Sequence, residues 1–330
     1  MKKIAVVLFM LSSMNAFTQF SPANKNASPE AKKLLSYLYG LNGNQTLTGQ
    51  HTYPPNFDQY MDTVKSMTGK YPAVWGADFI LHGTQDFGPD IVKEAIKKYR
   101  DGYIVTLMWH AGRPMDDAPF GWKESVQAEL DDAQWKELTT TGSGLNKKWE
   151  AQVDKIASYL KQLQDANVPV LWRPYHEMNG VWFWWGDKKG PDGYQKLFKM
   201  MFDRFVNIHK LNNLLWVWDA NGPRDLPFDQ AYSYADYYPG PEYVDVLATD
   251  VYHFDYEQKD YNELLDLAKG KLIALGECGE LPNPQILKVQ PRFTWFMVWG
   301  SFIIHDNPPG RVKEIYNLPQ VITHDEVIII

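Results

Sequence analysis

Eight short apolar runs alternate with segments of helical periodicity along most of the chain. The runs are continuously apolar, which is typical of strands buried on both faces in a parallel sheet. We expect strands at residues 46–51, 72–79, 103–110, 168–172, 214–218, 244–252, 271–277 and 293–299. Eight strand–helix units without a break in composition predict an α/β fold, a single (β/α)8 TIM barrel, rather than an open doubly wound sheet.

The segments between the runs predict helices of different clarity. From Leu145 to Leu163, apolar residues recur every three or four positions, which predicts an amphipathic helix. We expect Asp192 to cap the helix that carries apolar residues from Tyr194 to Ile208. Shorter helices are expected near residues 57–67, 90–100, 261–268 and 311–316. Residues 111–144 are expected to form a long, functional loop, because structureless connections of that length are otherwise uncommon.

The first residues are typical of a secretory signal. Lys2 and Lys3 precede the apolar run Ile4–Leu11, which is too short to span a bilayer stably, and small and polar residues follow to Gln19. We expect a signal peptide at residues 1–19 and one barrel domain at residues 20–330, with residues 21–30 forming a loose leader. Cys278 is the only cysteine, so no intrachain disulfide is possible. These features predict a secreted or periplasmic bacterial protein.

Charge and aromatic content narrow the class of ligand. The formal net charge of -7 argues against nucleic acid or an anionic membrane surface as a partner. The chain has 13 tryptophans, of which we expect about half in the core. The others are expected to line a groove and stack on flat apolar faces of a ligand. We expect a monomer.

Two glutamates stand where a barrel places its chemistry. Glu177 follows the fourth predicted strand and Glu277 ends the seventh, so both lie at strand carboxyl ends on opposite sides of the barrel mouth. Glycosidic cleavage uses such a pair, one residue protonating the leaving oxygen and the other attacking carbon or activating water. Taken singly, either glutamate could be an ion-paired loop residue. Glu280 is an alternative to Glu277, but Glu277 directly ends the apolar run.

Other chemistries have weaker support. His176-Glu177 begins like a zinc-protease helix, but Gly180 stands where the second histidine is required. Histidines at strand ends could still gather a metal, and the candidates are His110, His176, His209 and His253. Cys278 has no obvious base beside it, and we expect it to be a buried core residue. We expect no metal and no organic cofactor.

Four segments resemble one known family. The sequence WRPYHEMNGVWFWWG at residues 172–186 closely resembles the acid/base motif of glycoside hydrolase family 26, best known for endo-β-1,4-mannanases. Gly276–Gly279 resembles its nucleophile motif, and Thr249–Tyr252 and Met108–His110 are similar to further family segments. The resemblance extends from about Gly49 to Trp299.

This resemblance implies a retaining double displacement, with Glu177 as acid/base and Glu277 as nucleophile. It implies that His176 keeps the acid/base site in order and that Tyr252 positions the nucleophile. The residues expected to contact substrate are His110, His176, Trp182, Tyr252, Trp299 and Arg173.

The resemblance also implies a β-mannan substrate: mannan, glucomannan or galactomannan. Some mannanases of the family carry an arginine after the tryptophan at position 299, where this chain has Gly300. That difference concerns sugar sites further from the cleavage point. The family includes enzymes acting on mixed-linkage β-glucan and β-1,3-xylan, which are the alternative substrates. A non-catalytic carbohydrate-binding barrel is the alternative that needs no glutamate pair.

Overall fold

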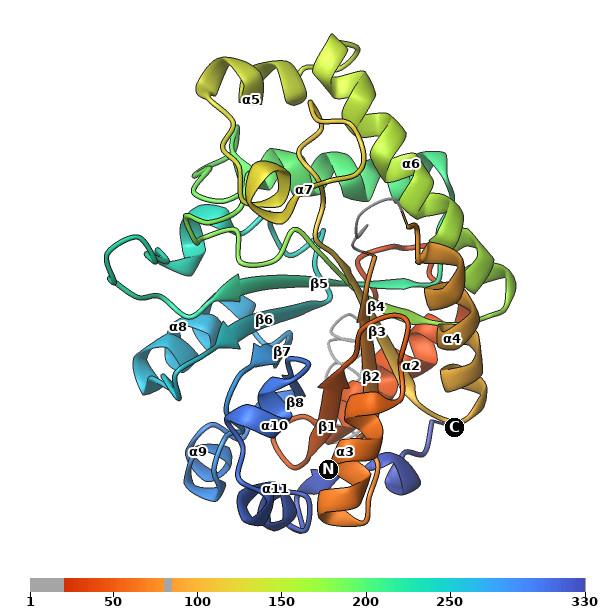
Figure 1. The fold of residues 1–330 in the computed structure, drawn as a ribbon, viewed down its shortest axis with the longest axis vertical. Helices are drawn as coiled ribbons and strands as arrows, with labels where there is room; N and C mark the ends of the chain where they lie inside the picture. The colour runs from red at the N-terminus through yellow and green to blue at the C-terminus, as the bar shows by residue number, and fades with distance from the viewer. Residues whose placement is uncertain (1–20, 80–84, 330) are drawn as a thin grey trace, which may run out of the picture.

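A computed structural model describes residues 21–79 and 85–329 as a closed parallel barrel. Each strand pairs with the next, and β8 pairs back with β1, which confirms the predicted single (β/α)8 barrel (Figure 1). The barrel strands are β1 (Thr46–His51), β2 (Val74–Asp78), β3 (Ile104–Trp109), β4 (Val170–Pro174), β5 (Leu214–Asn221), β6 (Val246–Val251), β7 (Leu272–Cys278) and β8 (Phe293–Val298). A short strand, β9 (Val321–Ile322), pairs with the first residues of β1. The predicted signal peptide lies outside the described residues.

Helices surround the strands, with α8 on the opposite side of the barrel from α4 and α6 (Figure 1). The α-helices are α2 (Pro29–Leu41), α3 (Gln59–Thr68), α4 (Gly88–Arg100), α5 (Asp132–Leu138), α6 (Gly144–Asp165), α7 (Tyr194–Asp203), α8 (Gln258–Ala268), α9 (Pro284–Val289), α10 (Phe302–His305) and α11 (Pro309–Ile315). Two 3₁₀ turns, η3 (Tyr234–Tyr237) and η4 (His324–Glu326), and two π-helical turns, η1 (Trp122–Val126) and η2 (Arg204–Ile208), complete the described structure. The apolar face predicted from Leu145 to Leu163 is buried in α6.

The apolar residues form two clusters because barrel strands alternate their side chains between inside and outside. The outer cluster packs tryptophans such as Trp172 and Trp216 against the helices. The inner cluster joins leucines of α2 to Leu171, Leu215 and other strand residues. Leu171 and Leu215 stand at the second position of β4 and β5, near the start of each strand, so α2 closes the amino end of the barrel.

The prediction of a loose leader over residues 21–30 is wrong. Ala23 and Asn24 are buried, and the Ala23 amide donates to Asp245 at 2.6 Å. Ser28 accepts a hydrogen bond from the Ala31 amide and caps α2, which the sequence pattern did not predict. The composition was misleading because small polar residues suit both a loose leader and a segment that wraps closely over a barrel end.

Two other local predictions are corrected. Asp192 does not cap the helix after β4: the residue before α7 is Gly193, which has no side chain to do so. Residues 111–144 are not one loop, because they contain η1 and α5, the latter closed by a capping box at Asp131. The short turns of this segment lack the repeated apolar spacing that a longer helix shows.

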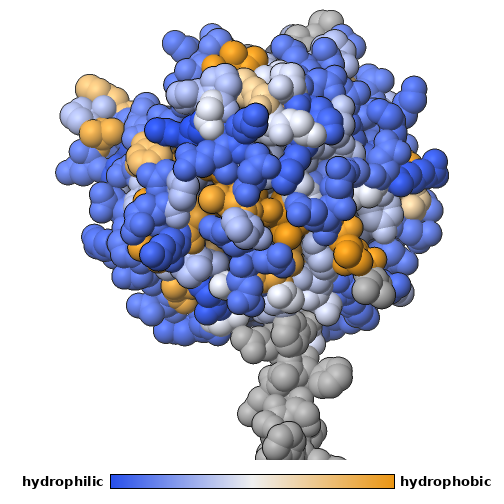
Figure 2. Space-filling model, turned by 90° about the horizontal axis from the view of Figure 1, so that it is seen from below, coloured by the Kyte–Doolittle hydropathy of each residue, from blue (hydrophilic) through white to orange (hydrophobic). Residues whose placement is uncertain are grey.

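The face seen from below in Figure 2 is mostly hydrophilic, and its hydrophobic side chains form small patches. Within residues 21–79 and 85–329, no helix combines the length and apolar character that crossing a membrane requires.

Candidate active site

A cleft of about 430 Å³ opens where the carboxyl ends of the strands converge. It is the expected location for chemistry in this fold, because loops and strand ends from many directions meet there. Seven of the eight residues predicted from the sequence line this cleft: His110, His176, Glu177, Trp182, Tyr252, Glu277 and Trp299. The eighth, Arg173, does not line it.

Glu177 is held from both carboxyl oxygens. The Asn221 side chain donates to Oε1 and the Trp182 indole donates to Oε2, each at 2.7 Å. The Glu177 backbone has a positive φ of 53° and is fixed by its amide, which donates to the Asp219 carbonyl oxygen at 2.8 Å. Such a conformation costs a non-glycine residue about 1–3 kcal/mol and is found mostly at functional sites. The strain therefore serves to aim the carboxyl group.

The pKa of Glu177 is raised to about 7. Burial is the main cause, because it disfavours the charged form, and repulsion by Glu277 adds to it. The hydrogen bonds from Asn221 and Trp182 oppose the shift. A carboxyl group in this range can both donate and accept a proton near neutral pH.

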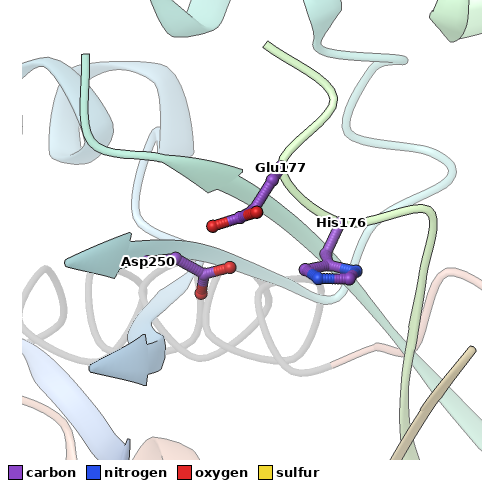
Figure 3. Close-up of side chains that lie close together, drawn as sticks. All are labelled: His176, Glu177 and Asp250. Carbon is purple, nitrogen blue, oxygen red and sulfur yellow. The ribbon is translucent and has the colours of Figure 1, made fainter. Parts of the chain in front are cut away.

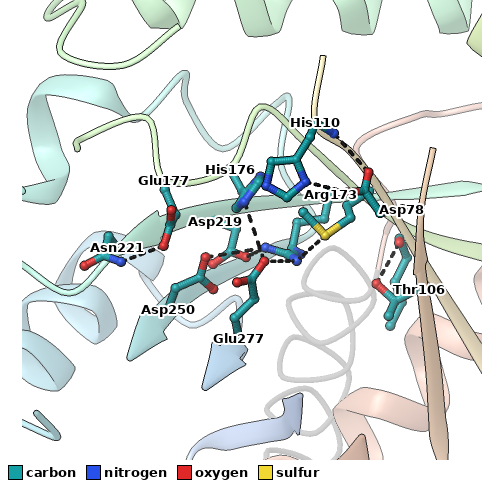
Figure 4. Close-up of polar contacts among 12 residues, drawn as sticks. Asp78, Thr106, His110, Arg173, His176, Glu177, Asp219, Asn221, Asp250 and Glu277 are labelled. Atoms are coloured by element: carbon teal, nitrogen blue, oxygen red, sulfur yellow. Dashed lines mark hydrogen bonds and ion pairs between the residues drawn. The ribbon is translucent and has the colours of Figure 1, made fainter. Parts of the chain in front are cut away.

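Glu277 has the opposite environment. Arg173 donates to Oε1 at 2.5 Å (Figure 4). The Tyr252 hydroxyl donates to Oε2 at 2.6 Å. His176 Nε2 lies 3.5 Å from the same Oε1. A cation and a phenol donor both favour a carboxylate anion, which is what a nucleophile requires. The predicted contact between Tyr252 and Glu277 is present in the structure.

Arg173 lies beneath the cleft and joins three acidic side chains. Besides Glu277, it contacts Asp219 at 2.6 Å and Asp250 at 3.5 Å. Position 276 is glycine because a Cβ there would lie 2.0 Å from Asp219 Oδ2. Arg173 is therefore placed to orient Glu277 through the protein interior, and its contacts are internal ion pairs rather than a wall of the cleft.

Asp219 and Asp250 sit close together beside this one guanidinium. Burial raises the pKa of Asp219 to about 6, although the Arg173 charge opposes the shift. Burial also raises the pKa of Asp250 well above its ordinary value, and repulsion by Asp219 and Glu277 adds to the effect. One positive charge lies among three acidic groups, so burial and mutual repulsion favour the protonated form of Asp250.

Two histidines form another wall of the site. Asp78 fixes His110 by accepting from its amide at 3.0 Å and by pairing with its Nδ1 at 2.5 Å. This pairing leaves Nε2 as the free ring nitrogen. The rings of His110 and His176 meet edge to face at 4.5 Å. Burial lowers the pKa of His176 well below its ordinary value, so this ring is neutral beside Glu277.

One group of described residues has the spacing of a metal site. The ligand atoms of His176, Glu177 and Asp250 lie within 4.8 Å of one another (Figure 3). Burial raises the pKa values of both carboxyl groups, so a metal ion would have to displace their protons in order to bind. Of the other candidate histidines, His209 pairs with Asp154 at 2.6 Å and does not line the cleft, whereas His253 does.

The tryptophan-rich stretch divides between cleft and core. Trp182 and Phe183 line the cleft. Trp184 and Trp185 are buried, and their indoles donate to the backbone of Ala111 and His176. Ten of the chain's 13 tryptophans are buried, more than the expected half. Trp184 and Trp185 therefore belong to the core rather than to the wall around Glu177.

The other nucleophile candidates lie outside the cleft. Glu280 accepts from the Phe254 amide at 3.2 Å and does not line the cleft. Cys278 is buried, and burial raises the pKa of its thiol to about 12, which suits a core residue. Both observations favour Glu277.

Sequence reasoning missed several residues of the site. Asn221, which contacts Glu177, belongs to β5, but the predicted strand ended at Trp218. Its signal was the short polar sequence Asp219-Ala220-Asn221 directly after an apolar run. The other missed residues that line the cleft come from short turns and loops, which carry no periodic signal: Trp122, Gln127, Arg224, Phe228 and Asp229.

The fold and the two glutamates define a class of protein. A (β/α)8 barrel with two buried carboxyl groups in opposite environments at its open end is the architecture of a glycoside hydrolase. The model of glycosyl hydrolase family 26 matches residues 23–326, so the chain belongs to this family. This confirms the resemblance found in the sequence.

Curated relatives and solved structures agree with this membership. A mannan endo-1,4-beta-mannosidase of Thermothelomyces thermophilus is 35% identical and covers 92% of this chain and 62% of the relative. Mannan endo-1,4-beta-mannosidase A of Piromyces sp is 32% identical, with 92% and 50% covered. The chain thus spans half to about two thirds of the length of these relatives.

Two solved structures match over nearly their whole length. GH26A from Muricauda sp. MAR_2010_75 superposes with a TM-score of 0.91 at 57% identity, covering 92% of this chain and 99% of that one. A beta-mannanase from a symbiotic protist of the termite Reticulitermes speratus, complexed with gluco-manno-oligosaccharide, has a TM-score of 0.81 at 30% identity, with 93% and 97% covered.

Proposed function

We propose that the chain is a retaining endo-β-1,4-mannanase that hydrolyses mannan, glucomannan or galactomannan. The observation that carries the proposal is the pair of cleft glutamates in opposite environments. Glu177 has a pKa raised to about 7 by burial and by Glu277, as an acid requires. Glu277 accepts hydrogen bonds from Arg173 and Tyr252, as a nucleophile requires.

The first step forms a glycosyl ester. A Glu277 carboxylate oxygen attacks the anomeric carbon while the bond from that carbon to the leaving oxygen breaks. The proton on Glu177 passes to the leaving oxygen. As Glu277 loses its charge in the ester, the Arg173 and Tyr252 donors keep its carboxyl group in position.

The second step reverses the roles. Water attacks the anomeric carbon, its proton passes to Glu177, and the Glu277 carboxylate leaves. Two inversions return the original anomeric configuration. The Glu177 pKa of about 7 suits both steps, because a group that alternates between acid and base works best near the operating pH.

Both the relatives and the cleft favour mannan as the substrate. The curated relatives are mannan endo-1,4-beta-mannosidases, and one similar structure is complexed with gluco-manno-oligosaccharide. His110, Trp182 and Trp299 supply the ring nitrogen and aromatic faces that pyranose rings bind. At Gly300, a Cβ would lie 2.2 Å from the Tyr53 hydroxyl, so Tyr53 occupies the space after Trp299.

A reducing-sugar assay on mannan, glucomannan, galactomannan, mixed-linkage β-glucan and β-1,3-xylan tests the proposal. We expect the highest kcat/KM on a β-mannan, with β-configured products observed first by proton NMR. Activity confined to β-glucan or xylan would transfer the assignment to those substrates. Binding of mannan without hydrolysis would support the non-catalytic alternative, and loss of activity with a chelator would revive the metal alternative.

We further propose that the protein is secreted, with residues 1–19 removed, and that it acts as a monomer. The charged and apolar pattern of those residues supports export. N-terminal sequencing of the protein recovered outside the cytoplasm tests the cleavage. Sedimentation of the purified protein tests the oligomeric state.

A further inference from the structure

A hydrogen-bonded loop of residues 222–233 follows β5 and reaches away from the barrel at the left of Figure 1. Arg224 and Ala231 exchange two backbone hydrogen bonds of 2.9 Å, which close the loop. The Arg224 guanidinium donates to the Asp229 carbonyl oxygen, the Asp229 carboxylate and the Asn221 side chain at 2.7–3.0 Å. These contacts give an irregular segment a defined shape.

Phe228, near the tip of this loop, is 96% exposed. It is the most exposed large hydrophobic side chain among residues 21–79 and 85–329. Its φ is 65°, in the left-handed region that bulky residues avoid. An apolar ring in water and a strained backbone both disfavour the folded state, and Phe228 has no buried packing to offset them. Both features are expected of a residue that contacts a ligand.

The loop lies on the Glu177 side of the cleft. The Arg224 guanidinium carbon is 4.9 Å from the centre of the Trp182 ring, and Trp182 donates to Glu177. Arg224, Phe228 and Asp229 all contribute to the wall of the cleft. Because Glu177 protonates the leaving oxygen, sugars bound on this side belong to the leaving part of the chain.

We propose that Phe228 is a stacking platform for a sugar on the leaving-group side, further from the cleavage point than the sugar beside Trp182. Its ring is exposed to solvent at the wall of the cleft. The ligand is the flat apolar face of a β-linked pyranose, and the Arg224 and Asp229 side chains provide polar groups for its hydroxyls. This inference rests on the proposed function and assigns a length-sensing role to one residue.

The test compares Phe228→Ala with Leu226→Ala on β-1,4-manno-oligosaccharides of three to six sugars. Leu226 is the matched control, because it is 48% exposed on the same loop but does not line the cleft. In Phe228→Ala, we expect the ratio of kcat/KM on the hexasaccharide to that on the trisaccharide to fall about 3- to 10-fold, the size of one lost stacking contact. Leu226→Ala keeps the wild-type ratio, and Phe228→Trp keeps or raises it.

Hydrolysis in ¹⁸O-labelled water marks the new reducing end and so shows which bond of the oligosaccharide was cut. The distribution of cut bonds shows how many sugars lay on the leaving-group side. Phe228→Ala should lose the binding modes that place two or more sugars on the leaving-group side, and should transfer fewer glycosyl groups to added oligosaccharide. An unchanged ratio and cleavage pattern, in a wild-type enzyme that hydrolyses the series, would overturn this inference alone. A wild-type enzyme inactive on the whole series would instead reject the proposed mannanase.

Discussion

The two ends of the barrel bury side chains of opposite character. At the amino end, leucines of α2 pack on Leu171, Leu215 and their apolar neighbours. At the carboxyl end, Arg173 is buried with Asp219, Asp250 and Glu277. Apolar burial stabilises the fold by roughly 25 cal/mol per Å², whereas buried charges lose hydration that their ion pairs repay only in part. The amino end therefore stabilises the fold, and this stability offsets the cost of the buried charged groups at the carboxyl end.

Positive φ angles occur at both ends, as at Asn167 and Lys269 before β4 and β7, but at the open end they include the site residue Glu177. Ser28 enters α2 as an ordinary helix cap with an extended backbone. At the open end, Tyr175 and Glu177 have positive φ angles of 48° and 53°. Strain of this kind persists only where surrounding contacts hold it, as the Asp219 carbonyl oxygen holds the Glu177 amide. Variants at the two ends should consequently separate activity from stability.

The largest expected effect is on turnover at the open end. Glu277→Ala should lower kcat by about 10⁴-fold or more, because it removes the nucleophile. Added azide should partly restore cleavage and give a product of inverted configuration. Glu280→Ala, three residues along, should keep kcat within a few-fold of wild type in the same assay. Near-normal turnover in Glu277→Ala would remove the basis for the double displacement.

Glu177→Gln should separate activity from stability most directly. Loss of the acid should lower kcat on mannan by about 10²–10⁴-fold. The pKa of Glu177 is about 7 in the folded protein against an ordinary value of 4.5. Between these pH values Glu177 ionises in the unfolded chain but stays protonated in the folded protein, which favours unfolding. Wild type should therefore lose stability relative to Glu177→Gln as pH rises through this window, by about 3 kcal/mol at pH 8.

Urea unfolding of both proteins at pH 4 and pH 8 measures that difference. At pH 4 the two should unfold at similar urea concentrations, because Glu177 is then protonated in both states. A variant that is less stable than wild type at pH 8 would contradict a raised pKa.

At the closed end, the effect should be on stability alone. Leu38 is fully buried in α2. Leu38→Ala should lower the free energy of unfolding by about 2–5 kcal/mol through lost burial and a residual cavity, while kcat/KM at 25 °C stays near wild type. Leu38→Met, which conserves volume, should cost less than about 1.5 kcal/mol. A large fall in kcat/KM of the folded Leu38→Ala protein would show that the two ends are coupled.

The smallest effect concerns the pH profile. kcat/KM should fall as pH rises through about 7, because Glu177 must be protonated in the first step. The hydrogen bond from the Trp182 indole lowers the pKa of Glu177. Trp182→Phe keeps an aromatic ring but removes this donor, so the pKa of Glu177 should rise. The alkaline limb should then move upward by less than about one unit. A downward movement would contradict the role given to this hydrogen bond.

The sequence predicted the barrel well because its strands are buried on both faces and need continuous apolar runs. All eight predicted strands are present, and β1 has the predicted bounds Thr46–His51. Strand ends were less certain: β5 continues to Asn221, since a polar sequence can pair in a sheet when its side chains point into a site. Because the sequence did not predict this extension, the contact between Asn221 and Glu177 was missed.

What the sequence determined by itself was the order of strands and helices and the position of Glu177 and Glu277 at two strand ends. Local periodicity and residue type suffice for these features. Only the tertiary structure decided that Arg173 lies under Glu277, that Trp184 and Trp185 belong to the core, and that residues 21–30 cover the barrel base. The physical reason is that burial, hydrogen-bond partners and raised pKa values arise from segments distant in sequence, which meet only when the barrel closes.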